Sequence, residues 1–261
     1  MKRYLTIFLL LFPICVFPAS AQNTSVRNAA EIRHALEKLN VLGSVLYIAA
    51  HPDDENTGPM AYWAGEKKYR TAYLSVTRGD GGQNLIGAEK GDDIGILRTQ
   101  ELLAARRVDG GEQFFTSALD FGYSKTVKES FEFWGYEETL ADVVWIVRTF
   151  RPDIIVTRFP TAESPGSHGH HPAASILAVD AFTAAADPSR FPEQLKYVQP
   201  WQTKRILLNV SRFGGAAAVE GLPSLNIGVY NPLLGLSYNE IAGRSRSMHR
   251  SQGFGTIPSS G

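Results

Sequence analysis

The sequence has almost no cysteine and no excess of charge of either sign. Its single cysteine, Cys15, lies in an apolar N-terminal stretch, so the rest of the chain can form no disulfide and offers no thiolate to a metal. With 26 basic and 26 acidic residues and no basic run, nothing points to a nucleic-acid partner. The GxGxxG and GxxxxGK[ST] spacings of nucleotide loops and the GxSxG element of serine hydrolases do not occur. Because the chain beyond Cys15 has no thiolate, any transition-metal site there must use histidine and carboxylate ligands.

The N-terminus has the pattern of an export signal. A positive start precedes an apolar core from Leu5 to Phe17, and Ala19-Ser20-Ala21 has the form of a cleavage site. We expect residues 1–21 to be removed near Ala21-Gln22, which gives an exported protein, periplasmic or extracellular. The apolar core is too short for a comfortable membrane span, so no stable membrane insertion is expected after cleavage. An uncleaved anchor is the alternative.

The remaining chain alternates apolar strands with helices, which predicts an α/β sandwich with a mostly parallel sheet. The strands are expected near residues 43–50, 71–77, 113–115, 154–157 and 204–210, and the helices near residues 28–39, 60–65, 94–108, 138–150 and 173–186. The stretch 119–136 is rich in aromatics and is expected to be irregular. One domain is expected over residues 22–243. Residues 244–261 are expected to be an irregular tail, the start of a longer chain that has been cut short.

One apolar strand ends abruptly in His51-Pro52-Asp53-Asp54-Glu55. Crowded carboxylates raise one another's pKa, a cost that a divalent metal would remove. His51 and Asp54 are three residues apart, so on one turn they point the same way and can hold two positions of a zinc site. Asp53 would then stand beside the metal as a general base. Glu55 is expected to be only a helix-start acid. The alternative for the whole stretch is an ordinary strand followed by a proline-started helix, whose N-terminus favours acids.

A second loop contains three of the six histidines, His168, His170 and His171, and also follows a strand. Ligands bind at the carboxyl ends of strands in such sheets, so the two loops are expected to meet. Together they offer two histidines and one carboxylate for zinc, with one further histidine and an open position for water. This inventory suits hydrolysis of an amide or ester.

The turn Arg78-Gly79-Asp80-Gly81-Gly82 follows the second strand. Its place suggests a loop that lines a substrate site, with Arg78 and Asp80 as candidate substrate-binding residues. A plain turn is the alternative.

The two histidine motifs resemble those of the LmbE-like or PIG-L deacetylases, over roughly Val45 to Val210, and the insertion at residues 83–93 resembles a secreted bacterial branch. The resemblance implies a Rossmann-like three-layer fold and zinc-dependent removal of acetyl groups from N-acetylglucosamine units. The implied zinc ligands are His51, Asp54 and His171. The implied general base is Asp53, and the implied histidine that stabilises the tetrahedral intermediate or acts as an acid is His168.

Two positions depart from the family's usual pattern, and two others match a further element of it. His170 takes the place of the acid in the usual H-P-D-H motif, where it is expected behind the metal ligands or facing solvent rather than on the metal. Arg98 and Glu101 match an R-x-x-E element of expected architectural role, and Asp80 replaces a usual glutamate. The expected protein is a zinc-dependent N-deacetylase with a small-molecule or glycan substrate. The alternatives are a zinc hydrolase of another amide or ester bond and a non-catalytic sugar-binding module.

Overall fold

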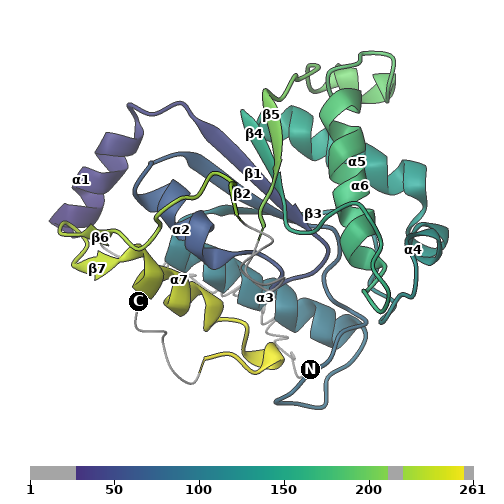
Figure 1. Ribbon diagram of the computed structural model, residues 1–261, viewed down its shortest axis with the longest axis horizontal. Coiled ribbons are helices and arrows are strands. Elements are labelled where there is room, and N and C mark those ends of the chain that lie inside the picture. The colour runs from purple at the N-terminus through teal and green to yellow at the C-terminus, as the bar shows by residue number, and fades with distance from the viewer. Residues whose placement is uncertain (1–27, 211–219, 256–261) are drawn as a thin grey trace, which may run out of the picture.

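The computed structural model describes residues 28–210 and 220–255 and is built around a parallel sheet of five strands (Figure 1). The strand order is β3-β2-β1-β4-β5, and all four pairings are parallel. The strands are β1 (Ser44–Ala49), β2 (Arg70–Ser75), β3 (Glu112–Phe115), β4 (Ile154–Thr157) and β5 (Arg205–Leu208). This confirms the predicted fold class and places every expected strand within a few residues.

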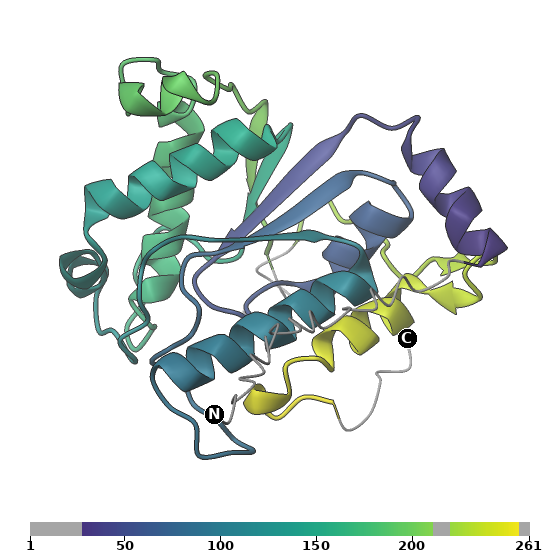
Figure 2. The same ribbon diagram turned by 180° about the vertical axis from the view of Figure 1, so that it is seen from behind.

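The central strand β1 explains why its sequence is continuously apolar. All six of its residues are buried, because helices cover both faces of the sheet. Leu46 and Ile48 pack against the layer of α5 and α6, whereas Val45 and Tyr47 pack toward α2 and α3. Figures 1 and 2 show α5 and α6 on one side of the sheet and α2, α3 and α7 on the other. The molecule is therefore a three-layer sandwich.

The helices follow the strands in the predicted alternation. Their bounds are α1 (Ala29–Lys38), α2 (Thr57–Gly65), α3 (Asp92–Asp109), α4 (Val127–Trp134), α5 (Tyr136–Phe150), α6 (His170–Ala184) and α7 (Tyr238–Arg246), with short 3-10 turns at η1 (Pro192–Lys196) and η4 (Arg250–Gln252). A small antiparallel pair, β6 (Tyr230–Asn231) and β7 (Leu236–Ser237), precedes α7.

Two expectations of irregular structure are wrong. The aromatic stretch contains α4, which Thr126 caps by accepting a hydrogen bond from the backbone N–H of Glu129. The expected tail begins inside α7 and continues into η4, and α7 starts with a complete capping box of Ser237 and Glu240. The missed signal in both cases is a hydroxyl residue followed three positions later by glutamate.

Helix α7 belongs to the sandwich because it buries an apolar face against α2. Tyr238 is fully buried and meets Tyr62 edge to face, with ring centroids 6.0 Å apart. Ile241 and Ala242 complete this contact. The last turn of α7 is thereby held beside the carboxyl ends of the central strands.

The expected signal segment, residues 1–21, lies outside the described residues. Among the helices that the structure describes, none combines the length and the apolar character needed to cross a bilayer.

Candidate metal centre and active site

The two histidine loops meet where the strand order reverses. The chain leaves β1 toward α2 on one face of the sheet and leaves β4 toward α6 on the other, which opens a crevice between these neighbouring strands. His51 follows β1, and His171 lies in the first turn of α6 after β4. Their ring centroids are 5.5 Å apart although the two residues lie 120 positions apart in the sequence. The predicted meeting of the loops is therefore seen in the structure.

His51, Asp54 and His171 form a group that can hold a metal ion. Asp54 Oδ2 lies 3.0 Å from His51 Nδ1, and Asp54 Oδ1 lies 3.7 Å from His171 Nε2. One ligand atom from each residue lies within 4.8 Å of the other two. Burial alone would raise the pKa of Asp54, but the imidazoles of His51 and His171 lower it below its ordinary value. The carboxylate is thus kept ionised, as a metal ligand must be.

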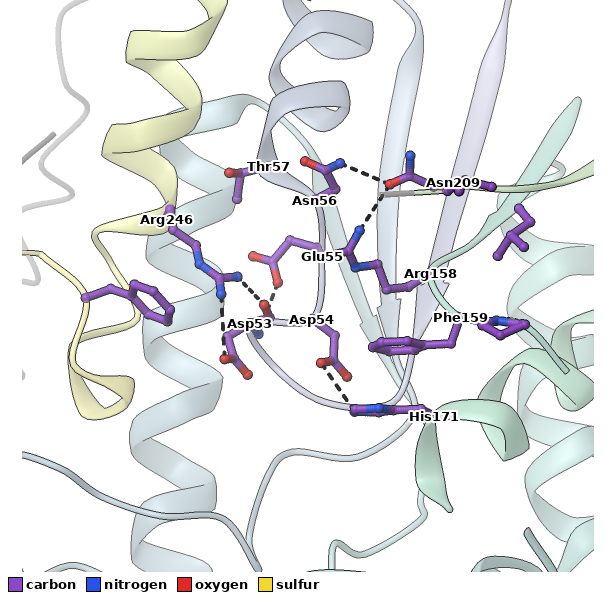
Figure 3. Close-up of a pocket in the computed structure, with 14 residues that line it drawn as sticks. Asp53, Asp54, Glu55, Asn56, Thr57, Arg158, Phe159, His171, Asn209 and Arg246 are labelled. Atoms are coloured by element: carbon purple, nitrogen blue, oxygen red, sulfur yellow. Dashed lines mark hydrogen bonds and ion pairs between the residues drawn. The ribbon is translucent and has the colours of Figure 1, made fainter. Parts of the chain in front are cut away.

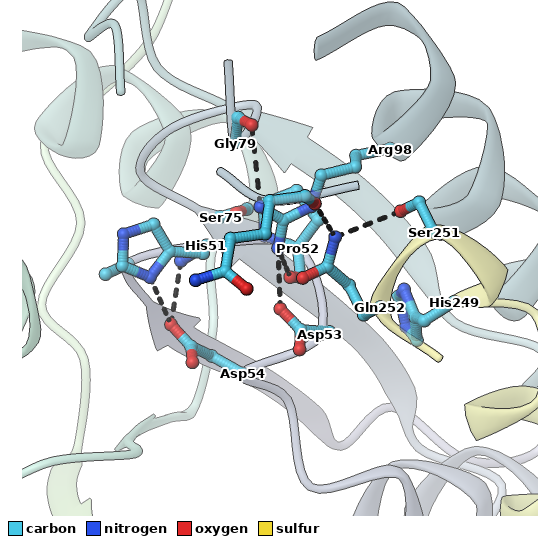
Figure 4. A network of polar contacts seen from close by, with 12 residues as sticks. His51, Pro52, Asp53, Asp54, Ser75, Gly79, Arg98, His249, Ser251 and Gln252 are labelled. Carbon is cyan, nitrogen blue, oxygen red and sulfur yellow. Dashed lines mark hydrogen bonds and ion pairs between the residues drawn. The ribbon is translucent and has the colours of Figure 1, made fainter. Parts of the chain in front are cut away.

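Asp53 occupies a strained turn beside this group. Its φ of 87° is in the left-handed region that a non-glycine residue rarely adopts, at a cost of about 1–3 kcal/mol. Arg98 Nη2 donates to Asp53 Oδ1 at 2.7 Å and to the Pro52 carbonyl at 2.6 Å (Figure 4). Burial and the neighbouring Asp54 raise the pKa of Asp53, while Arg98 and Arg246 oppose the rise. One carboxylate oxygen is engaged by Arg98, and Oδ2 lies 4.0 Å from Arg246 Nη2.

Glu55 is not a helix-start acid, so that expectation is wrong. Helix α2 begins two residues later and takes Asn56 as its N-cap. The carboxylate of Glu55 is buried and accepts hydrogen bonds from Arg106 at 3.1 Å, His249 at 2.7 Å and the backbone N–H of Asp53 at 3.0 Å. A buried carboxylate stays ionised only where such partners offset the loss of its hydration. Glu55 therefore supports the turn that carries Asp53.

His168 faces the metal group from the second loop. Its ring stacks on His51 at 4.9 Å between centroids and on Tyr123 at 5.1 Å. The backbone N–H of Ser124 donates to His168 Nδ1 at 3.2 Å, which places the proton of the neutral ring on Nε2. Burial, with smaller contributions from His51 and His171, lowers the pKa of His168 to about 4. At neutral pH the ring is an uncharged donor through Nε2.

His170 contacts a candidate ligand rather than solvent. It is fully buried, and its Nδ1 lies 3.0 Å from His51 Nε2. Burial first, and then His51, lowers the pKa of His170 to about 2. Asp120 stands behind the pair, with carboxylate oxygens 3.9 Å from His51 Nε2 and from His170 Nδ1. His170 thus does not face solvent, but with His51 and His168 it forms a second group that could hold a metal ion, so its expected place behind the metal ligands stays a prediction.

A cleft of about 830 Å³ opens over Asp53, Asp54 and His171 (Figure 3). Phe159 forms one wall and stacks on His171 with ring centroids 3.8 Å apart. The remaining lining comes from α2 and its N-cap, the ends of β4 and β5, the last turn of α7 and the chain after η4. These residues include Asn56, Thr57, Arg158, Pro160, Leu208, Asn209, Val210, Arg246 and Phe254.

Asn209 links the polar side of the cleft. Its Oδ1 accepts hydrogen bonds from the Tyr47 hydroxyl and Asn56 Nδ2, each at 3.0 Å, and from Arg158 Nη1 at 3.4 Å. Tyr47 comes from β1 and Arg158 follows β4, so this network ties neighbouring strand ends together.

The two candidate substrate-binding residues after β2 do not line this cleft. The Arg78 guanidinium packs over the Phe115 ring at 4.1 Å and donates to Thr99 Oγ1 at 3.2 Å. Asp80 lies beside Gly95 and lines a separate hollow in the loop before α3. The substrate-binding role of Arg78 and Asp80 stays a prediction.

Sequence reasoning missed several residues that surround the site. Arg98 was expected to be architectural, yet it holds Asp53 directly. Asp120, Asn209, Arg246 and His249 have no local motif that marks them. They reach the site only through the tertiary fold.

Comparison with known proteins assigns the family. The family model described as GlcNAc-PI de-N-acetylase (PIG-L) matches residues 46–182, which is more than half of the chain. A 1D-myo-inositol 2-acetamido-2-deoxy-alpha-D-glucopyranoside deacetylase 1 of Frankia alni is 32% identical over 196 residues, which are 66% of this chain and 65% of the relative. A deacetylase of the same substrate name from Streptomyces scabiei is 28% identical, over 72% of this chain and 61% of the relative. The chain thus spans a little under two thirds of the length of these relatives.

Solved structures show the same fold. The N,N'-diacetylchitobiose deacetylase from Pyrococcus horikoshii superposes with a TM-score of 0.59 at 18% identity, over 88% of this chain and 81% of that one. A conserved protein of Thermus thermophilus gives a TM-score of 0.52 at 20% identity, over 81% of this chain and 80% of that one. At such identities the likeness concerns the fold alone. The family model and the paired histidine motifs together establish that the chain belongs to the PIG-L (LmbE-like) family.

Proposed function

We propose that this protein is a zinc-dependent hydrolase that removes the acetyl group from an N-acetylated amino sugar of the N-acetylglucosamine type, carried in a larger conjugate. The observation that carries the proposal is the meeting of His51, Asp54 and His171 with the carboxylate of Asp53 on one side and the neutral His168 on the other. The names of the Frankia and Streptomyces relatives, deacetylases of a 2-acetamido sugar linked to inositol, support this substrate class.

The donor set fits zinc. His51, Asp54 and His171 supply two imidazoles and one carboxylate, the kind of three-residue set that catalytic zinc sites use, and the chain outside Cys15 has no thiolate to compete. When bound, zinc would lower the pKa of a water molecule toward ~7 and polarise the amide carbonyl.

Asp53 is the proposed general base. Its Oδ1 accepts a hydrogen bond from Arg98, and Oδ2, which lies 4.0 Å from Arg246 Nη2, is the oxygen that would take the proton from the attacking water. The raised pKa of Asp53, caused by burial and by Asp54, suits a group that first accepts a proton and then returns it. Water oxygen bonds to the acetyl carbon, the C–N bond breaks, and the proton passes from Asp53 to the departing amine. The products are acetate and the free amino sugar.

His168 is proposed to stabilise the oxyanion. Because Ser124 donates to Nδ1, the ring presents its Nε2–H, and the pKa of about 4 keeps it uncharged through neutral pH. A fixed neutral donor can bind the developing negative charge without first gaining a proton. This geometry favours a stabilising role for His168 over that of a general acid.

Metal analysis joined to acetate release tests the proposal. The purified protein is stripped with a chelator, reloaded with zinc and assayed on a panel of amino-sugar conjugates and cell-wall fragments. We expect one zinc per chain and zinc-dependent release of acetate. Asp53→Ala should keep its zinc and lose activity by ~10²-fold or more, because a positioned base contributes about that much. Full activity in that variant would overturn the assigned base.

Other outcomes would redirect the assignment. If the protein hydrolyses an ester or another amide but removes no acetyl group, the proposed metal site stands and the proposed substrate class is wrong. Saturable sugar binding without acetate release over the whole panel would favour a non-catalytic binding module.

We also propose that the protein acts after export, with cleavage near Ala21-Gln22. N-terminal sequencing of the protein secreted by a host cell tests this, and an uncut N-terminus would contradict it.

A further inference from the structure

A segment near the C-terminus, outside the part of the chain that the family model matches, contacts the turn that carries the proposed general base. The family model ends at residue 182, whereas the last turn of α7 and the turn η4 lie at residues 245–252. We call residues 245–252 the C-terminal clamp. Arg246 Nη1 donates to the carbonyl of Asp53 (Figure 3), and His249 Nε2 lies 2.7 Å from Glu55 Oε1. These contacts join residues 193 and 194 positions apart in the sequence.

The clamp is itself fixed by helix α3. Ser251 donates through its backbone N–H and its hydroxyl to the two carboxylate oxygens of Glu101, each at 2.7 Å. Ser245 donates to Asp109 Oδ2 at 2.7 Å. The R-x-x-E element of α3 therefore has two tasks, because Arg98 holds Asp53 while Glu101 holds the clamp.

We propose that Arg246 and His249 are positioning residues that fix the general base Asp53, so that the C-terminal clamp is a working part of the active site. This inference rests on the proposed function, because it takes Asp53 as the base. Neither residue is a metal ligand in the proposed site. Arg246 acts on Asp53 through its backbone carbonyl and through the ion pair with Oδ2, whereas His249 acts through Glu55.

The backbone of Asp53 explains why such support is needed. A non-glycine residue with a φ of 87° keeps that unfavourable conformation only where several surrounding contacts hold its backbone in place. The carbonyl of Pro52 is held by Arg98, the carbonyl of Asp53 by Arg246, and the N–H of Asp53 by Glu55. His249 in turn orients Glu55. Two of the three backbone anchors of the turn thus depend on the clamp.

The position of Arg246 allows this role to be tested apart from folding. Tyr238, Ile241 and Ala242 seat α7 on the core, whereas the Arg246 side chain is one-third exposed at the helix end. Its loss therefore removes an anchor of the turn and leaves the helix in place. Arg244, exposed on the same helix, provides a control with the same change of charge.

The experiment compares zinc-loaded Arg246→Ala, Arg246→Lys and Arg244→Ala in the full chain. For Arg246→Ala we expect kcat to fall ~10–100-fold with KM within about twofold, because misplacing a catalytic group by about 1 Å has effects of this size. The zinc content and thermal midpoint of Arg246→Ala should match those of Arg244→Ala, and Arg246→Lys should recover part of the lost kcat.

His249→Leu should lower kcat as Arg246→Ala does, and His249→Gln, which keeps an N–H for Glu55, should recover part of the lost kcat. A kcat for Arg246→Ala within about twofold of Arg244→Ala would overturn the proposal.

Hydrogen exchange separates this inference from the proposed function. If the wild-type protein releases no acetate from any substrate, the proposed function fails, and exchange of the peptide covering residues 51–56 decides the role of the clamp. Faster exchange in Arg246→Ala than in Arg244→Ala would support the positioning role. Equal exchange in the two variants would refute it.

Discussion

Replacing Glu55 by glutamine should lower the free energy of unfolding and make that free energy depend less on pH in the acid range. The side chain of Glu55 is completely buried, and its carboxylate accepts hydrogen bonds from Arg106, His249 and the Asp53 N–H. Glutamine keeps the shape but offers one oxygen and an amide nitrogen that can only donate. At least one of the three donors would then face another donor, and the charge of Arg106 would lose one of its two carboxylate partners, since Asp109 alone remains.

The size of the effect follows from the electrostatics of the site. Burial alone would raise the pKa of Glu55, but His249 and Arg106 lower it from 4.5 to about 2. A folded pKa below the unfolded one stabilises the fold above pH ~4.5, and this stabilisation is lost as the pH falls through the folded pKa. The gap corresponds to roughly 3 kcal/mol at ~1.4 kcal/mol per pKa unit. Breaking a buried ion pair costs about 3–5 kcal/mol, which agrees.

Urea unfolding followed by circular dichroism, at neutral pH and through the acid range, measures both consequences. Glu55→Gln should lose ~3 kcal/mol at pH 7, equivalent to a fall in Tm of about 6–12 °C for a domain of this size. Below pH ~4.5 the wild type should lose stability faster than the variant, because the variant has no carboxylate to protonate at this position. Glu193→Gln, at an exposed position, is the matched control. A Glu55→Gln protein within about 0.5 kcal/mol of that control at pH 7 would refute the reasoning.

The remaining predictions concern the histidines of the second loop. His168→Phe should keep its zinc, because His168 is not in the proposed ligand set, and should lower kcat for acetate release ~10²–10³-fold, the usual cost of losing one oxyanion donor; an unchanged kcat would exclude His168 from the reaction. His170→Asp should bind zinc within about tenfold of the wild type. His170→Leu, which removes the 3.0 Å contact of His51 Nε2, should bind it ~10–100-fold more weakly in a competition titration. Equal zinc affinity in the leucine variant would contradict this supporting role.

The fold could be predicted from sequence because its strands are short and continuously apolar and alternate with helices. In a parallel α/β sheet that order alone brings loops after different strands to one edge. His51 and His171 were therefore expected to meet without any knowledge of the packing, and their ring centroids lie 5.5 Å apart. The helices α4 and α7 were not predicted, because their N-terminal caps were not recognised.

The support around Asp53 could not be predicted in the same way. Arg246 lies in the last turn of α7 and His249 follows it, and nothing in their local sequence indicates that they reach Asp53 and Glu55. Glu55 itself reads as a favourable acid before a helix, and only tertiary structure shows that its carboxylate is buried against Arg106 and His249. Long-range polar contacts leave no periodic trace in a sequence.

His170 illustrates how a departure from a motif can be compensated elsewhere in the fold. An acid at this position would accept a hydrogen bond from a neighbouring histidine and add negative charge behind the metal. In this chain His170 Nδ1, 3.0 Å from His51 Nε2, can perform the first task when His51 carries its proton on Nε2, as it would with a metal on Nδ1. The second falls to Asp120, which comes from the loop after β3 and lies 3.9 Å from both rings. Because both the acceptor and the buried carboxylate are retained, the replacement of the motif's acid by histidine is no argument against an active metal site.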